Sequence, residues 1–257
     1  MGVPSCKPGL VGIALLLAVI SGVSRADTLN VAVASNFAET LEAIASEFEA
    51  ASAHEVRIIR GSSGKHYAQI VNGAPFDVFL SADQARPARL VEEGRGVNGS
   101  LRTYAVGQLA LWSREVSISL GKEYLLNTNN YATIAIANPR LAPYGQAALQ
   151  ALDSLGIDTE NGAIRLVLGE NIAQAFQFAY SGSADLGLIA YAQTQSQNLS
   201  NRGSLWRVPA SLHDPIRQDM VVLTDSVAAK QFAAFMEGEA ATAIIIKNGY
   251  LAPTLDP

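Results

Sequence analysis

Short apolar runs alternate along the chain with segments in which apolar positions recur every three or four residues. The run at 29–34 is typical of a buried strand, and the segment 37–50 has the spacing of an amphipathic helix. Asn36 followed by Glu39 is a capping-box pattern, which predicts a helix that begins directly after the strand. The positions that share the apolar face of this helix are Phe37, Leu41, Ile44, Ala45 and Phe48.

The same alternation continues to the end of the chain and predicts a mostly parallel sheet in each of two α/β lobes. The two groups of strand and helix units separate near residues 104–112, and the strand 218–223 returns the chain to the first group, which the C-terminal helix completes. We therefore predict a signal peptide at 1–26, lobe I at 27–105 plus 218–257, and lobe II at 106–217. Further strands are expected at 55–60, 75–83, 133–139, 164–170 and 185–191, and further helices at 65–73, around Arg89 and Leu90, at 142–156 and at 171–184.

The first 26 residues have the order of a secretory signal peptide. Lys7 precedes an apolar run at 10–20, and a stretch of small residues ends at Ala26. The run is shorter than the roughly 20 apolar residues that a membrane crossing needs. We therefore expect export to the periplasm, with cleavage near Ala26 releasing a soluble chain of residues 27–257.

Removal of the signal peptide changes the charge and the cysteine content. Lys7 and Arg25 are lost from 18 basic residues and no acid is lost from 23, so the net charge becomes −7. Cys6, the single cysteine, is also lost, which excludes a disulfide and thiol chemistry. The acidic balance disfavours a nucleic-acid partner, and we expect a monomer.

Four predicted junctions between a strand and a helix carry small or polar residues. Each can offer an unpaired backbone N–H from the first turn of a helix, which suits a fully ionised oxyanion. Ligands of open α/β sheets bind at the carboxyl ends of the strands, where such junctions converge. Ser and Asn are also the ordinary N-cap residues of helices that bind nothing, and this alternative stays open for any one junction. The junctions are Ser35 with Asn36, Ser62 with Ser63, Tyr144 with Gly145, and Asn171 with Ile172.

Nucleotide and metal sites are not indicated. The segment 61–65, GSSGK, has Ile59 and His66 where a phosphate-binding loop needs glycine and Ser or Thr. His54, His66 and His213 lack the spacing of metal ligands, so we expect them at the surface or in helix caps. The sequence predicts no cofactor and no bare metal cation.

Enzymatic chemistry is also weakly supported. Asp77, Asp83 and Asp185 stand beside predicted strand ends or turns, where acids commonly accept hydrogen bonds from the backbone. An exported serine hydrolase would need a base near a serine such as Ser63, and the sequence lacks the G-x-S-x-G elbow. The only histidine close to Ser63 in sequence is His66, on the following helix.

Taken together, these segments resemble the periplasmic molybdate-binding proteins of ABC transporters across essentially the whole chain after the signal peptide. The resemblance implies a type II periplasmic-binding-protein fold, in which two mixed-sheet α/β lobes are joined by crossover strands. It is carried, in order, by VAVASNF at 31–37, GSSGKHYAQIVNGAPFDVFLSAD at 61–83, NPRLAPYGQAALQALDSLG at 138–156, GENIAQAF at 169–176 and GLIAY at 187–191.

The resemblance also implies a function and a set of ligand contacts. The protein would capture molybdate, and also tungstate, as the oxyanion and deliver it to the membrane permease of an ABC importer, without catalysis. A receptor for sulfate or phosphate on the same scaffold is the nearest alternative, and an exported serine hydrolase is a more distant one. The implied contacts are Ser35, Asn36, Ser63, Tyr144, the backbone N–H of Ile172, and Tyr191, whose counterpart contacts the anion in some members; Ser62 and Asn171 are flanking candidates.

Overall fold

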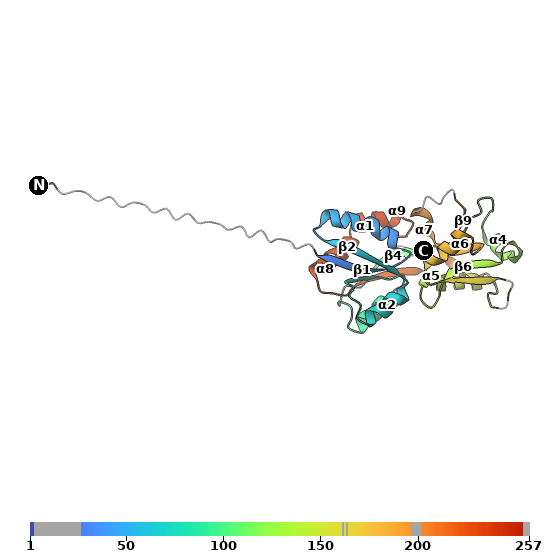
Figure 1. The fold of residues 1–257 in the computed structure, drawn as a ribbon, viewed down its shortest axis with the longest axis horizontal. Helices are drawn as coiled ribbons and strands as arrows, with labels where there is room; N and C mark the ends of the chain where they lie inside the picture. The colour runs from blue at the N-terminus through green and yellow to red at the C-terminus, as the bar shows by residue number, and fades with distance from the viewer. Residues whose placement is uncertain (3–26, 161, 163, 197–201, 254–257) are drawn as a thin grey trace.

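A computed structural model of the chain describes residues 1–2, 27–160, 162, 164–196 and 202–253. These residues form two α/β lobes, each built on its own five-stranded sheet, which lie side by side in Figure 1. The prediction of two mixed-sheet lobes is confirmed. The predicted signal peptide falls outside the described residues, apart from its first two. Within the described ranges, no helix has both the length and the apolar character needed to cross a membrane.

The sheet of lobe I has the strand order β2-β1-β3-β10-β4. Its first three strands are parallel, and β10 runs antiparallel to both of its neighbours. The strands are β1 (Thr28–Ala34), β2 (Glu55–Gly61), β3 (Val78–Leu80), β4 (Arg102–Gly107) and β10 (Ile216–Val222). The helices are α1 (Ala38–Ala51), α2 (Ser63–Val71), α3 (Ala85–Glu92), α8 (Val227–Met236) and α9 (Glu239–Lys247).

Both faces of the sheet are buried at β1, as its apolar run requires. On β1, Val31 and Val33 pack towards α1, α8 and α9, whereas Ala32 packs on the opposite face with Ile70 of α2 and Leu90 of α3. This alternation is the period of two expected for a strand that is covered on both sides. The helices around the sheet are thereby fixed relative to the strand ends.

Lobe II repeats this plan with the strand order β7-β6-β8-β5-β9. Strand β6 is parallel to β7 and β8, and β5 is antiparallel to β8 and β9. The strands are β5 (Leu109–Ser113), β6 (Thr133–Ala137), β7 (Arg165–Gly169), β8 (Leu186–Ala190) and β9 (Ser204–Arg207). The helices are α4 (Lys122–Leu126), α5 (Pro143–Ser154), α6 (Ile172–Ser181) and α7 (Tyr191–Ser196), with 3-10 turns at Thr128–Asn130 and Ala210–Leu212.

The chain crosses between the two sheets at Gln108, which separates β4 from β5, and again between β9 and β10. The predicted lobe boundaries at 105/106 and 217/218 fall inside β4 and β10, where Val106 pairs with Arg217 in the sheet of lobe I. The residue limits of the lobes therefore stay a prediction.

Glycine is required where α5 meets the end of β6. A Cβ atom at Gly145, in the first turn of α5, would lie 2.1 Å from the carbonyl oxygen of Ala137. Because this neighbour is backbone, it cannot rotate away. The close approach sets the position of the N-terminus of α5 at the boundary between the lobes.

Replacing Gly145 with alanine should therefore destabilise lobe II. We expect Gly145→Ala to lower the free energy of unfolding by about 1–3 kcal/mol, the usual cost of overpacking, as measured by urea denaturation. Gly121→Ala is the control, because the nearest atom to a Cβ there, at 3.5 Å, is the end of the Glu123 side chain and its φ of 179° suits any residue. Equal stability of both variants and the wild type would contradict the assigned packing.

Candidate functional site

Four junctions at the carboxyl ends of strands meet at one small cavity between the lobes. Lobe I contributes the ends of β1 and β2, and lobe II contributes the N-termini of α5 and α6. The lining residues are Ala34, Ser35, Asn36, Gly61, Ser62, Ser63, Ala82, Ala142, Pro143, Tyr144, Asn171 and Ile172.

The lining carries backbone N–H groups that the described part of the chain leaves without an acceptor. They belong to Asn36, Ser63, Tyr144 and Ile172. The last three lie in the first turns of α2, α5 and α6, where a helix supplies no acceptor of its own. Buried N–H groups are normally paired, so such a group of donors at one cavity favours an anionic ligand.

Ser63 adds a hydroxyl donor to this set. Its side chain is buried, and its Oγ accepts a hydrogen bond of 2.9 Å from the backbone N–H of Ala82. Because the N–H occupies a lone pair, the hydroxyl proton remains available to a ligand. The neighbouring Ser62 is the N-cap of α2, where its Oγ accepts from the backbone N–H of Lys65 at 3.4 Å.

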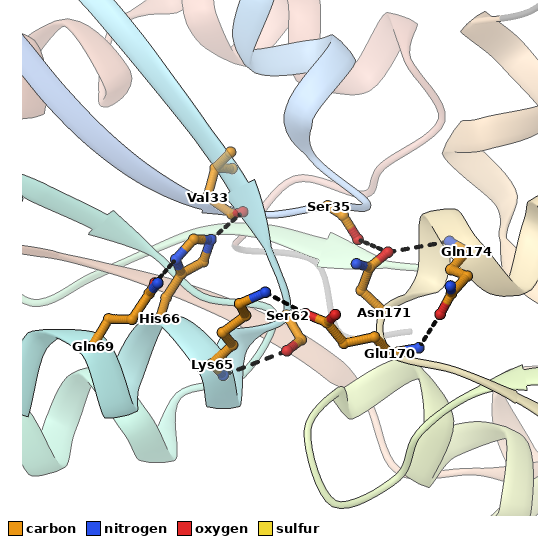
Figure 2. A network of polar contacts seen from close by, with 9 residues as sticks. All are labelled: Val33, Ser35, Ser62, Lys65, His66, Gln69, Glu170, Asn171 and Gln174. Carbon is orange, nitrogen blue, oxygen red and sulfur yellow. Dashed lines mark hydrogen bonds and ion pairs between the residues drawn. The ribbon is translucent and has the colours of Figure 1, made fainter.

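Ser35 and Asn171 connect the two lobes at the edge of the cavity (Figure 2). Ser35 Oγ donates to Asn171 Oδ1 at 3.2 Å and accepts from the backbone N–H of Ala173 at 3.4 Å. Asn171 is also the N-cap of α6, where its Oδ1 accepts from Gln174 N at 3.1 Å. The capping role predicted as the alternative for Asn171 is thus real, and the same side chain also contacts lobe I.

Asn36 does not cap α1, so the predicted capping box with Glu39 is wrong. The side-chain Nδ2 of Asn36 instead donates to Gln218 Oε1 at 2.8 Å and to the hydroxyl of Tyr250 at 3.2 Å. The N-cap position is occupied by Phe37, which makes no side-chain cap. Tertiary partners far along the chain have displaced the local hydrogen bond.

The cavity holds no charge of its own. No Lys, Arg, His, Asp or Glu lines it. Burial, followed by the proximity of Tyr250, raises the pKa of Tyr144 well above its ordinary value, so the phenol stays neutral. Across the cleft, Lys65 Nζ and Glu170 Oε1 form an ion pair of 2.9 Å between α2 and the segment before α6 (Figure 2). A ligand in the cavity therefore meets neutral donors only.

Two histidines lie in places that the sequence did not predict. His54 and His66 are buried, where surface or capping positions were expected. His66 packs beneath the end of β1, with Nε2 3.1 Å from the carbonyl oxygen of Val33 and Nδ1 3.1 Å from Gln69 Oε1. The ring of His66 supports the end of β1. Among the described residues, no cluster of His, Cys, Asp or Glu could hold a metal ion.

The three aspartates serve the backbone, as predicted. Asp77 accepts from the N–H of Asn30, Asp83 from that of Arg86, and Asp185 from the N–H groups of Ala132 and Thr133. None of the three lines the cavity.

Tyr191 is the one candidate that does not line the cavity. It lies at the start of α7, where its backbone N–H donates to Gln108 O at 2.9 Å. Its ring faces Arg207, whose guanidinium carbon is 5.2 Å from the ring centre. These contacts place Tyr191 where the chain crosses between the lobes. The sequence pattern GLIAY alone does not predict this position.

Sequence reasoning missed the polar residues behind the cavity. Gln218, Tyr104 and Tyr250 are buried and bonded to one another or to Asn36. Gln218 was counted as the first residue of an apolar strand, and its polar side chain in that strand was the only signal in the sequence.

Known proteins match most of the described fold. The family of bacterial extracellular solute-binding proteins matches residues 29–251. The chain belongs to this family. The molybdate-binding protein ModA of Azotobacter vinelandii is 43% identical over 241 residues, which cover 93% of this chain and 95% of that protein. ModA of Rhodobacter capsulatus is 40% identical over 248 residues, covering 95% and 96%.

The solved structures agree with this assignment. The periplasmic molybdate-binding protein of Azotobacter vinelandii matches with a TM-score of 0.83 and 41% identity, over 88% of this solute-binding protein and 100% of that chain. The type II bilobal fold that the sequence resemblance implied is therefore confirmed.

The buried His66 should make the stability of this solute-binding protein depend on pH. Burial, only partly opposed by the hydrogen bonds to Gln69 and Val33, lowers the pKa of His66 below its ordinary value of 6.5. The unfolded chain therefore binds a proton at a higher pH than the folded chain, and stability should fall as the pH falls below 6.5. We expect an NMR titration midpoint for His66 below 6.5.

The variant His66→Gln, which cannot be protonated, should lose this part of the pH dependence in thermal unfolding between pH 7.5 and 5.5. A titration midpoint for His66 at or above 6.5 would show that the ring is more exposed to water than its position under β1 implies.

Proposed function

We propose that this protein captures molybdate in the periplasm and delivers it to the membrane permease of an ABC importer, with tungstate as a second ligand. The observation that carries the proposal is the convergence of unpaired N–H groups from both lobes on one uncharged cavity. The identity to proteins named for molybdate binding agrees with it. The role is binding without catalysis, and the protein acts as a monomer.

The chemistry of the cavity suits a fully ionised tetrahedral anion. Backbone N–H groups at helix N-termini carry partial positive charge and point at the ligand. Hydrogen bonds to a charged acceptor contribute about 1.5–3 kcal/mol each, so several together offset the loss of hydration. A fixed positive charge is not needed, because these donors are held in place by the fold.

The donors we assign are the hydroxyls of Ser35 and Ser63 and the backbone N–H groups of Asn36, Tyr144 and Ile172. Ser63 supplies its backbone N–H as well. Ser62 and Asn171 support them as the N-caps of α2 and α6. For Tyr191, the contacts with Gln108 and Arg207 favour a role in joining the lobes over contact with the anion.

The alternatives are less well supported. A serine hydrolase would need a base on Ser63, but the ring of His66 is engaged with Val33 and Gln69. A receptor for sulfate or phosphate would use the same kinds of hydrogen-bond donor. Molybdate is distinguished from these two anions by its larger size. Export by a cleaved signal peptide agrees with membership of an extracellular family.

Molybdate and tungstate should stabilise the chain from residue 27 onward, and sulfate and phosphate should not. A ligand at 100 times its Kd adds about 2.7 kcal/mol to the free energy of unfolding. Thermal unfolding with each anion measures this directly. A higher unfolding temperature with sulfate or phosphate alone would identify that anion as the ligand in place of molybdate. An unfolding temperature unchanged by every anion would refute oxyanion capture.

Ser63→Ala should weaken molybdate binding about 10- to 100-fold, since it removes one hydrogen bond to a charged group. Isothermal titration calorimetry gives the Kd. Ser226→Ala is the matched control, because Ser226 Oγ also accepts a backbone N–H, from Ala229, but lies at the N-terminus of α8 away from the cavity. Equal Kd values for the two variants would contradict the assignment of Ser63.

The ion pair between Lys65 and Glu170 should slow the release of the anion. Glu170→Gln removes a negative charge, which by charge alone would favour the anion, but it also breaks a contact between the lobes. Exposed ion pairs contribute about 0.2–1 kcal/mol, so we expect dissociation about 1.5- to 5-fold faster in stopped-flow measurements at low salt, and less in high salt.

Glu237→Gln is the control for this experiment. Glu237 pairs with Arg102 at similar exposure, but both residues belong to lobe I and neither lines the cleft, so its loss should leave the dissociation rate unchanged. Slower release from the Glu170 variant would mean that its charge matters and the contact between the lobes does not.

A further inference from the structure

Gln218 is a buried polar side chain at an irregular place in β10. It is completely shielded from solvent. The register of β10 against β4 shifts between Gln218 and Asp219, as in a β-bulge. Bulges redirect side chains and are frequent next to functional sites. A buried amide is costly unless all of its groups are bonded, so the partners of Gln218 define its role.

Those partners come from both lobes. Gln218 Oε1 accepts from Asn36 Nδ2 at 2.8 Å and lies 3.0 Å from the hydroxyl of Tyr104. Its Nε2 donates to the hydroxyl of Tyr144, in lobe II, at 3.4 Å. One amide thus connects the turn before α1 with the first turn of α5, the two segments that bring Asn36 and Tyr144 to the cavity.

Gly107 leaves the space for this contact. A Cβ atom at Gly107 would lie 2.2 Å from Tyr144 Oη and 2.7 Å from Gln218 Nε2. Gly107 is the last residue of β4, immediately before the chain crosses into lobe II. The glycine therefore allows the phenol and the amide to meet behind the cavity.

These contacts also decide which groups of Asn36 and Tyr144 face the ligand. Both protons of Asn36 Nδ2 are used, one by Gln218 and the other by Tyr250, whose hydroxyl in turn donates to Asn36 O at 2.7 Å. The hydroxyl of Tyr144 lies against Gly107 and Gln218. Each residue is left with its backbone N–H for the cavity.

We propose that Gln218 is a positioning residue that fixes the distance between the backbone donors of Asn36 and Tyr144 across the cleft. This distance determines which size of oxyanion the protein binds. The inference rests on the proposed function. Donors held at a fixed separation fit the larger molybdate and are too distant for sulfate, whereas donors free to move adapt to both.

The test uses Gln218→Met and Gln218→Glu in the chain from residue 27 onward. Methionine keeps the length and loses the hydrogen bonds. We expect a molybdate Kd about tenfold higher by isothermal titration calorimetry, as for the loss of one to two net hydrogen bonds. The ratio of the sulfate Kd to the molybdate Kd should fall.

Gln218→Glu provides a second variant of unchanged shape. A protonated carboxyl accepts from Asn36 and donates to Tyr144 as the amide does, whereas an ionised one cannot donate. The Gln218 side chain contacts the phenols of Tyr104 and Tyr144, which burial keeps neutral, and the carboxylates of Asp83 and Asp219 and the phenol of Tyr250 act on Tyr104. Burial and these carboxylates favour the protonated form. Affinity should therefore be near that of the wild type at pH 6 and fall towards pH 8.5.

Asn129→Asp is the control, since it adds the same charge at an exposed position of the 3-10 turn Thr128–Asn130, which does not line the cavity. It should bind equally well at both pH values. Unchanged Kd values and an unchanged ratio in both Gln218 variants would overturn the inference, as would a lower Tm without any change in binding. Failure of the wild type to bind molybdate would instead refute the proposed function on which the inference rests.

Discussion

Unpaired backbone donors at helix N-termini are the constraint on which the rest of this structure depends. A helix cannot satisfy its own first N–H groups, and in this fold those of α2, α5 and α6 open on one cavity. The donors come from both lobes, so they can surround a ligand only when the lobes are together. The parallel strands β1, β2, β6 and β7 serve this arrangement, because their carboxyl ends bring the four junctions to the same place.

The side chains around the cavity hold those donors in position. Ser62 and Asn171 cap the helices, Ala82 N orients the hydroxyl of Ser63, and the ring of His66 supports the end of β1. Buried polar groups of this kind add little net stability, but they exclude other arrangements when all of their bonds are made. In the described part of the chain, no buried side-chain nitrogen or oxygen lacks a partner.

The sequence predicted what depends on local pattern. Alternating strands and helices indicated two lobes, and small polar residues at strand ends indicated the four junctions. It could not predict contacts between distant segments. Asn36 matched a capping box, yet it bonds Gln218 and Tyr250, which are 182 and 214 residues away. His66 was expected at the surface or in a helix cap. The residues next to it in sequence do not show that β1 covers its ring or that Val33 O lies within hydrogen-bond distance.

The contacts between the lobes differ in how far they are exposed to water. The ion pair of Lys65 with Glu170 is about half exposed, and the bond between Ser35 and Asn171 is partly buried, so both can exchange with water at small cost. The contact of Gln218 with Tyr144 is fully buried beside the crossing strands. Water can therefore replace each bond at the outer edge of the cleft, whereas the inner contact is shielded from water and has no such substitute.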